Sequence, residues 1–128
     1  MNKEIISIET APAAVGPYSQ GVRSGDLVFT AGQLGLVPET GDFAGPDIQT
    51  QTRQALGNLK EVLEAGGSDL EHVLKVTVFL QDMGEFSQMN EVYAEFFPKD
   101  PPARSAVQVA ALPLGGRVEI EAVAEVCG

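Results

Sequence analysis

Arginine and glutamate residues in the last quarter of the chain are the strongest candidates for chemistry. Arg104 follows Pro101-Pro102-Ala103 and begins a segment of alternating residues, and Glu119 and Glu121 share one face of the next such segment. In a cleft, a guanidinium binds a carboxylate through two parallel hydrogen bonds, whereas an exposed Arg–Glu pair contributes under about 1 kcal/mol. From spacing alone, a surface pair on adjacent strands is favoured at about three to one.

Other reactive side chains give weaker signals. The single histidine, His72, follows the cap-like segment Ser68-Asp69-Leu70-Glu71, so no Ser-His-Asp arrangement is indicated. The glycines between positions 32 and 41 lack the spacing of a phosphate-binding loop. The single cysteine, Cys127, predicts no intrachain disulfide and no cysteine-based metal site, and we expect an exposed tail thiol.

Two segments are predicted to be helices. In Asp47–Ala65 the apolar residues recur at helical spacing, and Gly66-Gly67 is a typical helix stop. In Glu85–Phe97 the aromatic and apolar residues follow the same pattern, and Pro98 prevents continuation. Each helix should therefore bury one face.

The remaining segments are predicted to be strands because apolar and polar residues alternate in them or because turn residues bound them. They are Ser19–Val22, Leu27–Leu34, His72–Gln81, Arg104–Ala110 and Arg117–Val126. Leu112–Gly116 is expected to join the last two as a C-terminal hairpin.

The strand from His72 predicts an oligomer. Leu74, Val76, Val78 and Leu80 fall on one face, whereas Val73, Lys75, Thr77 and Phe79 fall on the other. Two helices can cover only one side of such a sheet. Apolar surface left on the second face would cost roughly 25 cal/mol per Å², so self-association is expected.

Composition limits the class of protein. A chain of 128 residues with 44% apolar and 20% charged residues predicts a single soluble domain spanning 1–128. A net charge of −10 disfavours nucleic acid as a partner. The N-terminal segment lacks the long apolar region of a secretory signal, no apolar run reaches membrane-spanning length, and a cytoplasmic location is expected.

Five segments resemble the reactive-intermediate deaminase family, also called RidA or YjgF. They occur in order along nearly the whole chain: Ala11–Gly21 (APAAVGPYSQG), Thr30–Gln33 (TAGQ), Asn90–Tyr93 (NEVY), Pro102–Ser105 (PARS) and Val118–Ala122 (VEIEA). The PARS and VEIEA segments at this separation, together with GPYSQ, are specific to the family.

The resemblance implies an α+β fold, chorismate-mutase-like (YjgF/L-PSP-like), with a mixed sheet, two helices on one face and a homotrimer. It implies active sites between subunits that hydrolyse small 2-imino acids and their enamines, such as 2-aminoacrylate, 2-iminobutanoate and 2-iminopropanoate. The products are the 2-oxo acid and ammonia. Neither a metal nor an organic cofactor is expected.

The resemblance also assigns residues. Arg104 corresponds to the arginine that binds the substrate carboxylate, and Glu119 to the glutamate that positions or activates water and relays protons. Tyr18, Gly32 and Asn90 correspond to positions that line the pocket. Spacing alone would make Tyr18 a packing aromatic.

Two positions depart from the family pattern. Many members have cysteine where this chain has Ala106, a position that contributes mainly a main-chain contact to substrate binding, and serine where it has Ala31. We expect the Ala31 change to alter substrate preference, so the particular imine stays open. Two other functions also stay open: a non-catalytic trimer that binds small carboxylates, and an endoribonuclease or translation inhibitor.

Overall fold

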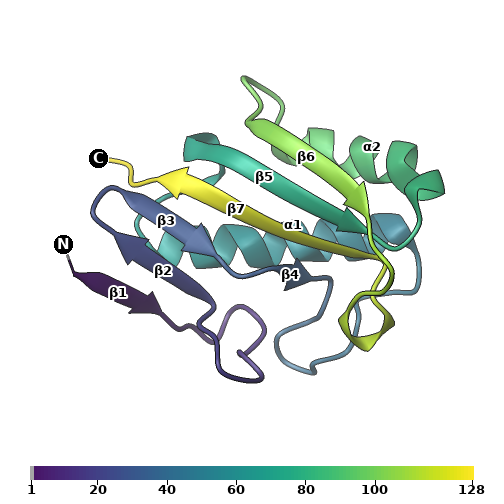
Figure 1. Ribbon diagram of the computed structural model, residues 1–128, viewed down its shortest axis with the longest axis horizontal. Helices are drawn as coiled ribbons and strands as arrows, with labels where there is room; N and C mark the ends of the chain where they lie inside the picture. The colour runs from purple at the N-terminus through teal and green to yellow at the C-terminus, as the bar shows by residue number, and fades with distance from the viewer. Residues whose placement is uncertain (1) are drawn as a thin grey trace.

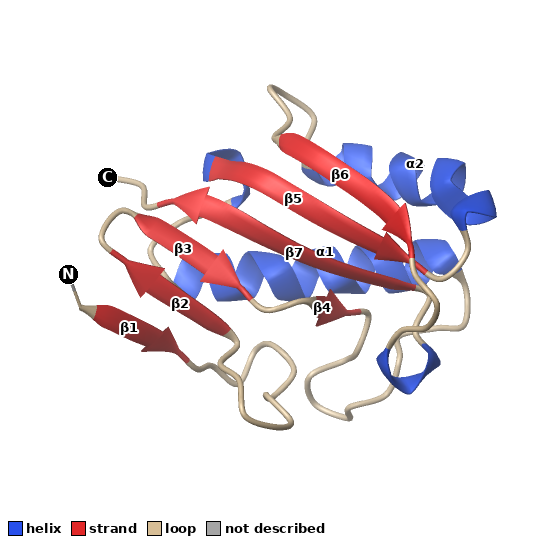
Figure 2. Ribbon diagram, in the orientation of Figure 1, coloured by secondary structure: helices blue, strands red, loops and turns tan. Residues whose placement is uncertain are grey.

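Two helices cover one face of a single mixed β-sheet in the computed structural model, which describes residues 2–128 (Figures 1 and 2). The elements in chain order are β1 (Lys3–Ile6), β2 (Gly21–Ser24), β3 (Leu27–Thr30), β4 (Gln33–Leu34), α1 (Ile48–Ala65), η1 (Leu70–His72), β5 (Val73–Leu80), η2 (Met83–Glu85), α2 (Phe86–Phe96), β6 (Ala103–Gln108), η3 (Pro113–Gly115) and β7 (Val118–Glu125). The predicted mixed sheet with two helices on one face is confirmed.

The sheet order places β5 between the last two strands. The strands run β1-β2-β3-β7-β5-β6, and β4 also pairs with β7. β6 is parallel to β5, with α2 as the crossover, while β7 is antiparallel to β5 (Figure 1). The predicted C-terminal hairpin is therefore wrong: alternation reveals a strand but not its partner, and η3 begins a return to the far side of β5.

Both predicted helices form, with ends set by local chemistry. Asp47 caps α1 by accepting the Thr50 main-chain N–H at 2.9 Å. At the other end Gly67 has φ +87°, and Ser68 N donates to Leu63 O at 2.9 Å, which closes the helix. α1 consequently lays a buried apolar face along the sheet.

β5 is confirmed as a strand, but its first residues are shifted from the predicted faces. A bulge between Val73 and Lys75 interrupts the pairing with β7. Because of it Val73 is buried and Leu74 is 46% exposed, the reverse of the prediction. From Val76 onward the predicted alternation holds.

Near the N-terminus the sheet is larger than predicted. β1 pairs with β2 although its residues, Lys3–Ile6, gave no clear strand pattern. The predicted strand Leu27–Leu34 divides into β3 and β4. The break between them contains Gly32.

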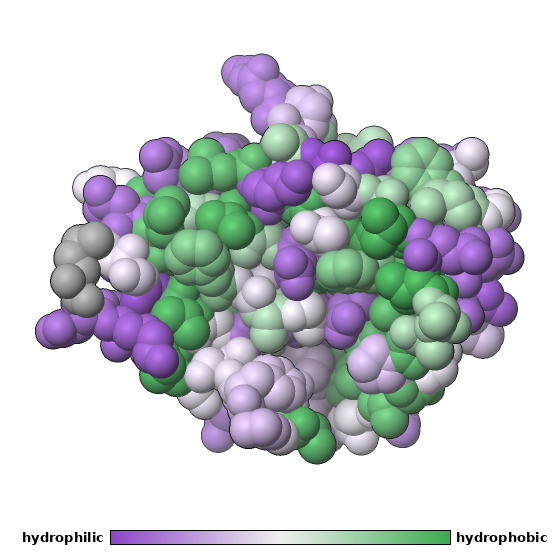
Figure 3. Space-filling model, in the orientation of Figure 1, coloured by the Kyte–Doolittle hydropathy of each residue, from purple (hydrophilic) through white to green (hydrophobic). Residues whose placement is uncertain are grey.

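The face of the sheet away from the helices is only partly polar. Phe29 is 42% exposed and Val107 is 43% exposed. Figure 3 shows this face, with apolar side chains gathered over β3 and over the start of β5, which lies beyond β7. Within residues 2–128, no helix is long and apolar enough to cross a membrane.

Candidate active site

Glu119 lies on the open face of β7 and approaches the main chain of Gly32. Its neighbours Val118 and Ile120 are buried under the helices, so alternation directs Glu119 to the other side. A Cβ at Gly32 would lie 2.7 Å from Glu119 Cδ, so only glycine permits this approach. Burial, and then the charge of Glu121, raises the pKa of Glu119 above its ordinary value.

A loop anchored by Gln20 holds Tyr18 beside this carboxylate. The buried Gln20 amide accepts from Ile8 N at 2.6 Å and donates to Pro12 O at 2.8 Å. The Tyr18 hydroxyl accepts from Val15 N at 3.2 Å, and its ring remains half-exposed. Tyr18 is therefore held at a pocket rim, in contrast to the packing position that spacing alone favours.

These residues surround a cavity of about 670 Å³, here named the Glu119 pocket. Its lining includes Tyr18, Ala31, Gly32, Leu114 and Glu119. Figure 3 shows a hollow low in the view, between the loop before β2 and the η3 turn. The pocket thus brings together three predicted site residues, Tyr18, Gly32 and Glu119. It also contains Ala31, which stands where many family members have serine.

Buried amides from α1 support the floor of the Glu119 pocket. Asn58 Nδ2 donates to Leu34 O at 3.1 Å and to Leu36 O at 2.8 Å. Gln51 donates to Gly45 O and accepts from Arg117 N, both at 2.9 Å. These bonds satisfy main-chain groups in β4 and in the irregular segments around it.

Arg104 lies on the helix-covered side of β6. Its Nη1 donates to Asn90 Oδ1 at 2.8 Å. Its guanidinium carbon lies 4.6 Å from the Tyr93 ring centroid and 5.4 Å from that of Phe86. A second pocket lies here, named the Arg104 pocket, and is lined by Asn90, Tyr93, Ala94, Phe97, Pro101, Pro102 and Arg104.

Neither charged group is neutralised within the chain. Among residues 2–128, no acidic side chain lies within 4.0 Å of an Arg104 nitrogen, and no basic one lies that close to Glu119. Because Asn90 is a neutral acceptor, it orients the guanidinium without cancelling its charge. Arg104 is therefore prepared for an external anion.

Tyr93 is a site residue that periodicity assigned to the core. Its hydroxyl is buried with no hydrogen-bond partner among the described residues, and burial raises its pKa while the charge of Arg104 opposes the rise. Phe86, Asn90 and Tyr93 occupy successive turns of one face of α2. The i, i+4, i+7 spacing that predicts a core stripe also places all three around Arg104.

Ala106 does not line either pocket. Its side chain packs against the hydrophobic core, on the same face of β6 as Arg104. β6 is an edge strand, so its outward main-chain groups have no strand partner among the described residues. Only the main chain at this position is available to a ligand.

The two pockets lie on opposite sides of the sheet. Arg104 faces α2, Glu119 faces away from both helices, and β5 separates their strands. The interpretation of these residues as a surface pair on adjacent strands is therefore wrong. One chain assembles Glu119 with Gly32 and Tyr18, and separately Arg104 with Asn90, but does not unite the two groups.

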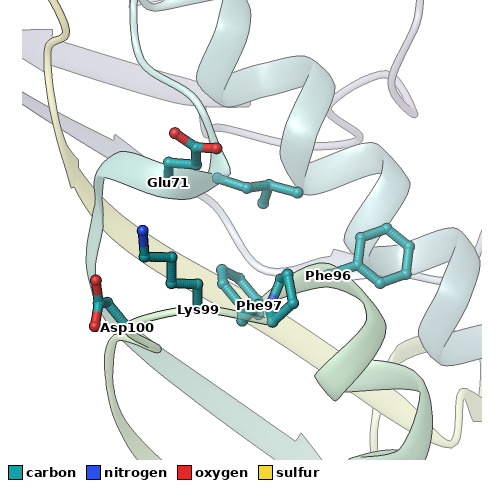
Figure 4. Close-up of a pocket in the computed structure, with 7 residues that line it drawn as sticks. Glu71, Phe96, Phe97, Lys99 and Asp100 are labelled. Atoms are coloured by element: carbon teal, nitrogen blue, oxygen red, sulfur yellow. The ribbon is translucent and has the colours of Figure 1, made fainter.

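A third pocket and the cysteine lie outside both groups. Glu71, Lys99 and Asp100 lie at one side of this pocket, between η1 and the segment after α2, with Phe97 beside them (Figure 4). None of the predicted site residues lines it. Cys127 is half-buried and donates to Gly67 O at 3.2 Å, so the prediction of an exposed tail thiol is wrong.

The fold and site define a small α+β protein that presents an arginine and a glutamate on opposite faces of one sheet, neither with an oppositely charged partner among residues 2–128. The chain belongs to the Endoribonuclease L-PSP family, whose model matches residues 8–126. This family membership confirms the predicted RidA/YjgF resemblance, because similar proteins carry the names Reactive Intermediate Deaminase A and YjgF.

Two curated relatives are similar over most of the chain. Reactive Intermediate Deaminase A of Arabidopsis thaliana, a chloroplastic protein, is 50% identical over 97% of this chain, which spans 66% of that protein's length. The 2-iminobutanoate/2-iminopropanoate deaminase of Bos taurus is 48% identical over 95% of this chain and 89% of its own.

Solved structures share the fold. E. coli TdcF with bound serine has a TM-score of 0.92 and 44% identity, covering 95% of this chain and 98% of its own. A protein described as a putative endoribonuclease of Thermotoga maritima has a TM-score of 0.94 and 46% identity, covering 98% of each chain.

Proposed function

We propose that this protein hydrolyses the C=N bond of small 2-imino acids, releasing the 2-oxo acid and ammonia. The observation that carries the proposal is the pair of unneutralised groups, Arg104 held by Asn90 and Glu119 held against Gly32. A relative at 48% identity is named as a 2-iminobutanoate/2-iminopropanoate deaminase, and another at 50% identity as a reactive intermediate deaminase. Suitable substrates are 2-iminobutanoate, 2-iminopropanoate and its enamine tautomer 2-aminoacrylate.

In this reaction Arg104 binds the substrate carboxylate through two parallel hydrogen bonds. The rings of Tyr93 and Phe86 keep the guanidinium plane in place. The charge of an iminium carbon already makes it electrophilic, so orientation and a nearby base supply most of what the reaction needs. No metal and no organic cofactor is required.

Glu119 takes a proton from water as the water oxygen bonds to the imine carbon. It then returns that proton to nitrogen. As the C–N bond breaks and ammonia leaves, Glu119 takes up the remaining hydroxyl proton and the carbonyl forms. A carboxylate whose pKa is raised toward the working pH transfers protons more effectively in both directions. Tyr18 and Gly32 line the space in which the imine carbon lies.

The active site is completed between chains of a homotrimer with the chorismate-mutase-like arrangement. The support is geometric: Arg104 and Glu119 face opposite sides of one sheet, so a shared site needs the Arg104 pocket of one copy beside the Glu119 pocket of its neighbour. The exposed apolar surface around Phe29 and Val107 supplies a contact face. The main chain of Ala106, on the edge strand, is available at this junction.

The experiment is a coupled assay in which a threonine dehydratase generates 2-iminobutanoate and release of 2-oxobutanoate is followed with a trapping amine present. The wild-type protein should accelerate release, and Arg104→Ala should abolish the acceleration. Glu119→Gln should retain carboxylate binding and lose rate. Normal binding without any wild-type acceleration would instead favour the carboxylate-binding trimer.

The ribonuclease alternative is disfavoured by charge. A net charge of −10 repels a phosphate backbone, and the protein has only 8 Lys and Arg residues. RNA binding that weakens steeply with salt would revive it. The same composition and the single cysteine support a cytoplasmic location.

A further inference from the structure

Asp69, His72 and Cys127 place an oxygen, a nitrogen and a sulfur atom together where β7 ends and β5 begins. One ligand atom from each lies within 4.8 Å of the other two. Asp69 Oδ1 lies 2.7 Å from His72 Nδ1, and Cys127 Sγ donates to Asp69 Oδ2 at 3.6 Å. All three residues are half-buried, so water and ions can reach them.

Main-chain contacts hold these side chains in place from both directions along the chain. Asp69 is the N-cap of η1 and accepts from His72 N at 3.0 Å. Cys127 N donates to Gly67 O at 3.0 Å, and Ser68 Oγ donates to Glu125 O at 2.5 Å. The cluster therefore does not depend on the chance position of one flexible side chain.

The surroundings favour a cation. The charges of Asp69, Glu71 and Glu125 all act on the His72 ring, so the local field is negative. Within residues 2–128, no Lys or Arg nitrogen lies within 4.0 Å of the Asp69 carboxylate.

We propose that Asp69, His72 and Cys127 bind one Zn²⁺ ion per chain. A thiolate, an imidazole nitrogen and a carboxylate oxygen form a ligand set that zinc accepts, with water as the fourth ligand. A tetrahedral ion with bonds of about 2.0–2.3 Å separates its ligands by roughly 3.3–3.8 Å. The present Sγ–Oδ2 distance of 3.6 Å already falls in that range.

Binding replaces protons with the metal. The Cys127 thiol loses its proton as the S–Zn bond forms. The proton that His72 Nδ1 shares with Asp69 leaves that nitrogen, and the neutral imidazole keeps one proton on Nε2. With Oδ2 as the ligand oxygen, the 2.7 Å hydrogen bond between Oδ1 and Nδ1 breaks as Nδ1 turns to the ion. The ion ties the segment after β7 to η1, which should raise the melting temperature.

The test is calorimetric titration of ZnCl₂ into the full chain after removal of metal by a chelator. We expect one Zn²⁺ per chain, proton release that depends on the buffer, and a higher melting temperature. Co²⁺ should give the charge-transfer absorption of a thiolate ligand. Cys127→Ser and His72→Gln should each weaken binding at least tenfold, whereas the remote variant Glu39→Gln should bind as the wild type does.

Three results would overturn the zinc site. They are no saturable binding by the wild type, Zn²⁺ binding that is unchanged in Cys127→Ser, and equally tight binding of Mg²⁺ or Ca²⁺, which ignore thiolates. Melting temperatures of the variants without metal separate misfolding from lost ligands. Because none of these readouts is turnover, the outcome does not depend on imine hydrolysis.

Discussion

Gly32→Ala tests whether the position of the Glu119 carboxylate controls turnover. The added Cβ would lie 2.7 Å from Glu119 Cδ, 2.9 Å from Cγ and 3.0 Å from Oε2. Ordinary contact begins at 3.4 Å, so the carboxylate carbon must move by 0.7 Å to restore it. A displacement of about 1 Å at a reacting group can cost on the order of 100-fold.

We therefore expect kcat in the coupled imine assay to fall by roughly 10-fold to 100-fold. The fold should persist, because Glu119 is only half-buried and can rotate toward solvent. Circular dichroism and the melting temperature would confirm this. The backbone of Gly32 does not have a positive φ, so alanine adds no backbone strain there.

Gly57→Ala provides a matched control. This glycine lies within α1, and a Cβ there meets no atom within 4 Å. Alanine should leave kcat unchanged and stabilise the helix by about 0.5–1 kcal/mol. An unchanged kcat in Gly32→Ala, or a rise in KM alone, would refute the argument that Gly32 positions Glu119.

Three further predictions concern single side chains. Arg104→Lys keeps the positive charge but cannot make two parallel hydrogen bonds to the substrate carboxylate. We expect kcat/KM to fall about 10-fold to 100-fold, which corresponds to the loss of one charged hydrogen bond, and wild-type kinetics would contradict bidentate binding. Glu119→Gln should raise the melting temperature at pH 7. The folded-state pKa of Glu119 lies above its ordinary value of 4.5, so ionisation of this carboxyl destabilises the folded protein as pH rises from 4.5 through the folded-state pKa. The gain in melting temperature should therefore vanish below about pH 4, where the carboxyl is protonated in both states, and a pH-independent gain would refute this cause. Asn58→Ala removes hydrogen bonds to one buried and one partly buried main-chain carbonyl, and should lower the free energy of unfolding by about 2–4 kcal/mol in urea denaturation. A loss under about 1 kcal/mol would mean that water replaces the amide.

Local sequence rules predicted the elements better than their pairing. The glycine pair after α1 and the proline after α2 end both helices near the predicted residues, because capping and steric blocks act within one turn. The partner of β6 was not predictable in this way. Whether β6 pairs with β5 or β7 depends on a crossover through α2, which alternation does not encode.

The candidate site was predicted only in part for the same reason. The family motifs identify Arg104 and Glu119, but their distribution between opposite faces depends on the sheet order. The cluster of Asp69, His72 and Cys127 escaped prediction because its members lie up to 58 residues apart and meet only when β7 returns beside η1. The bulge that buries Val73 and exposes Leu74 likewise depends on pairing with β7.

The most direct test of a site shared between chains is complementation of Arg104→Ala by Glu119→Gln. Each variant alone should be inactive in the coupled imine assay. After unfolding and refolding as an equal mixture, random trimers should place an intact Arg104 beside an intact Glu119 at about one quarter of the interfaces. We therefore predict recovery of about a quarter of the wild-type specific activity. An inactive mixture, with mixed trimers demonstrated by mass, would contradict the proposal that neighbouring chains complete the site.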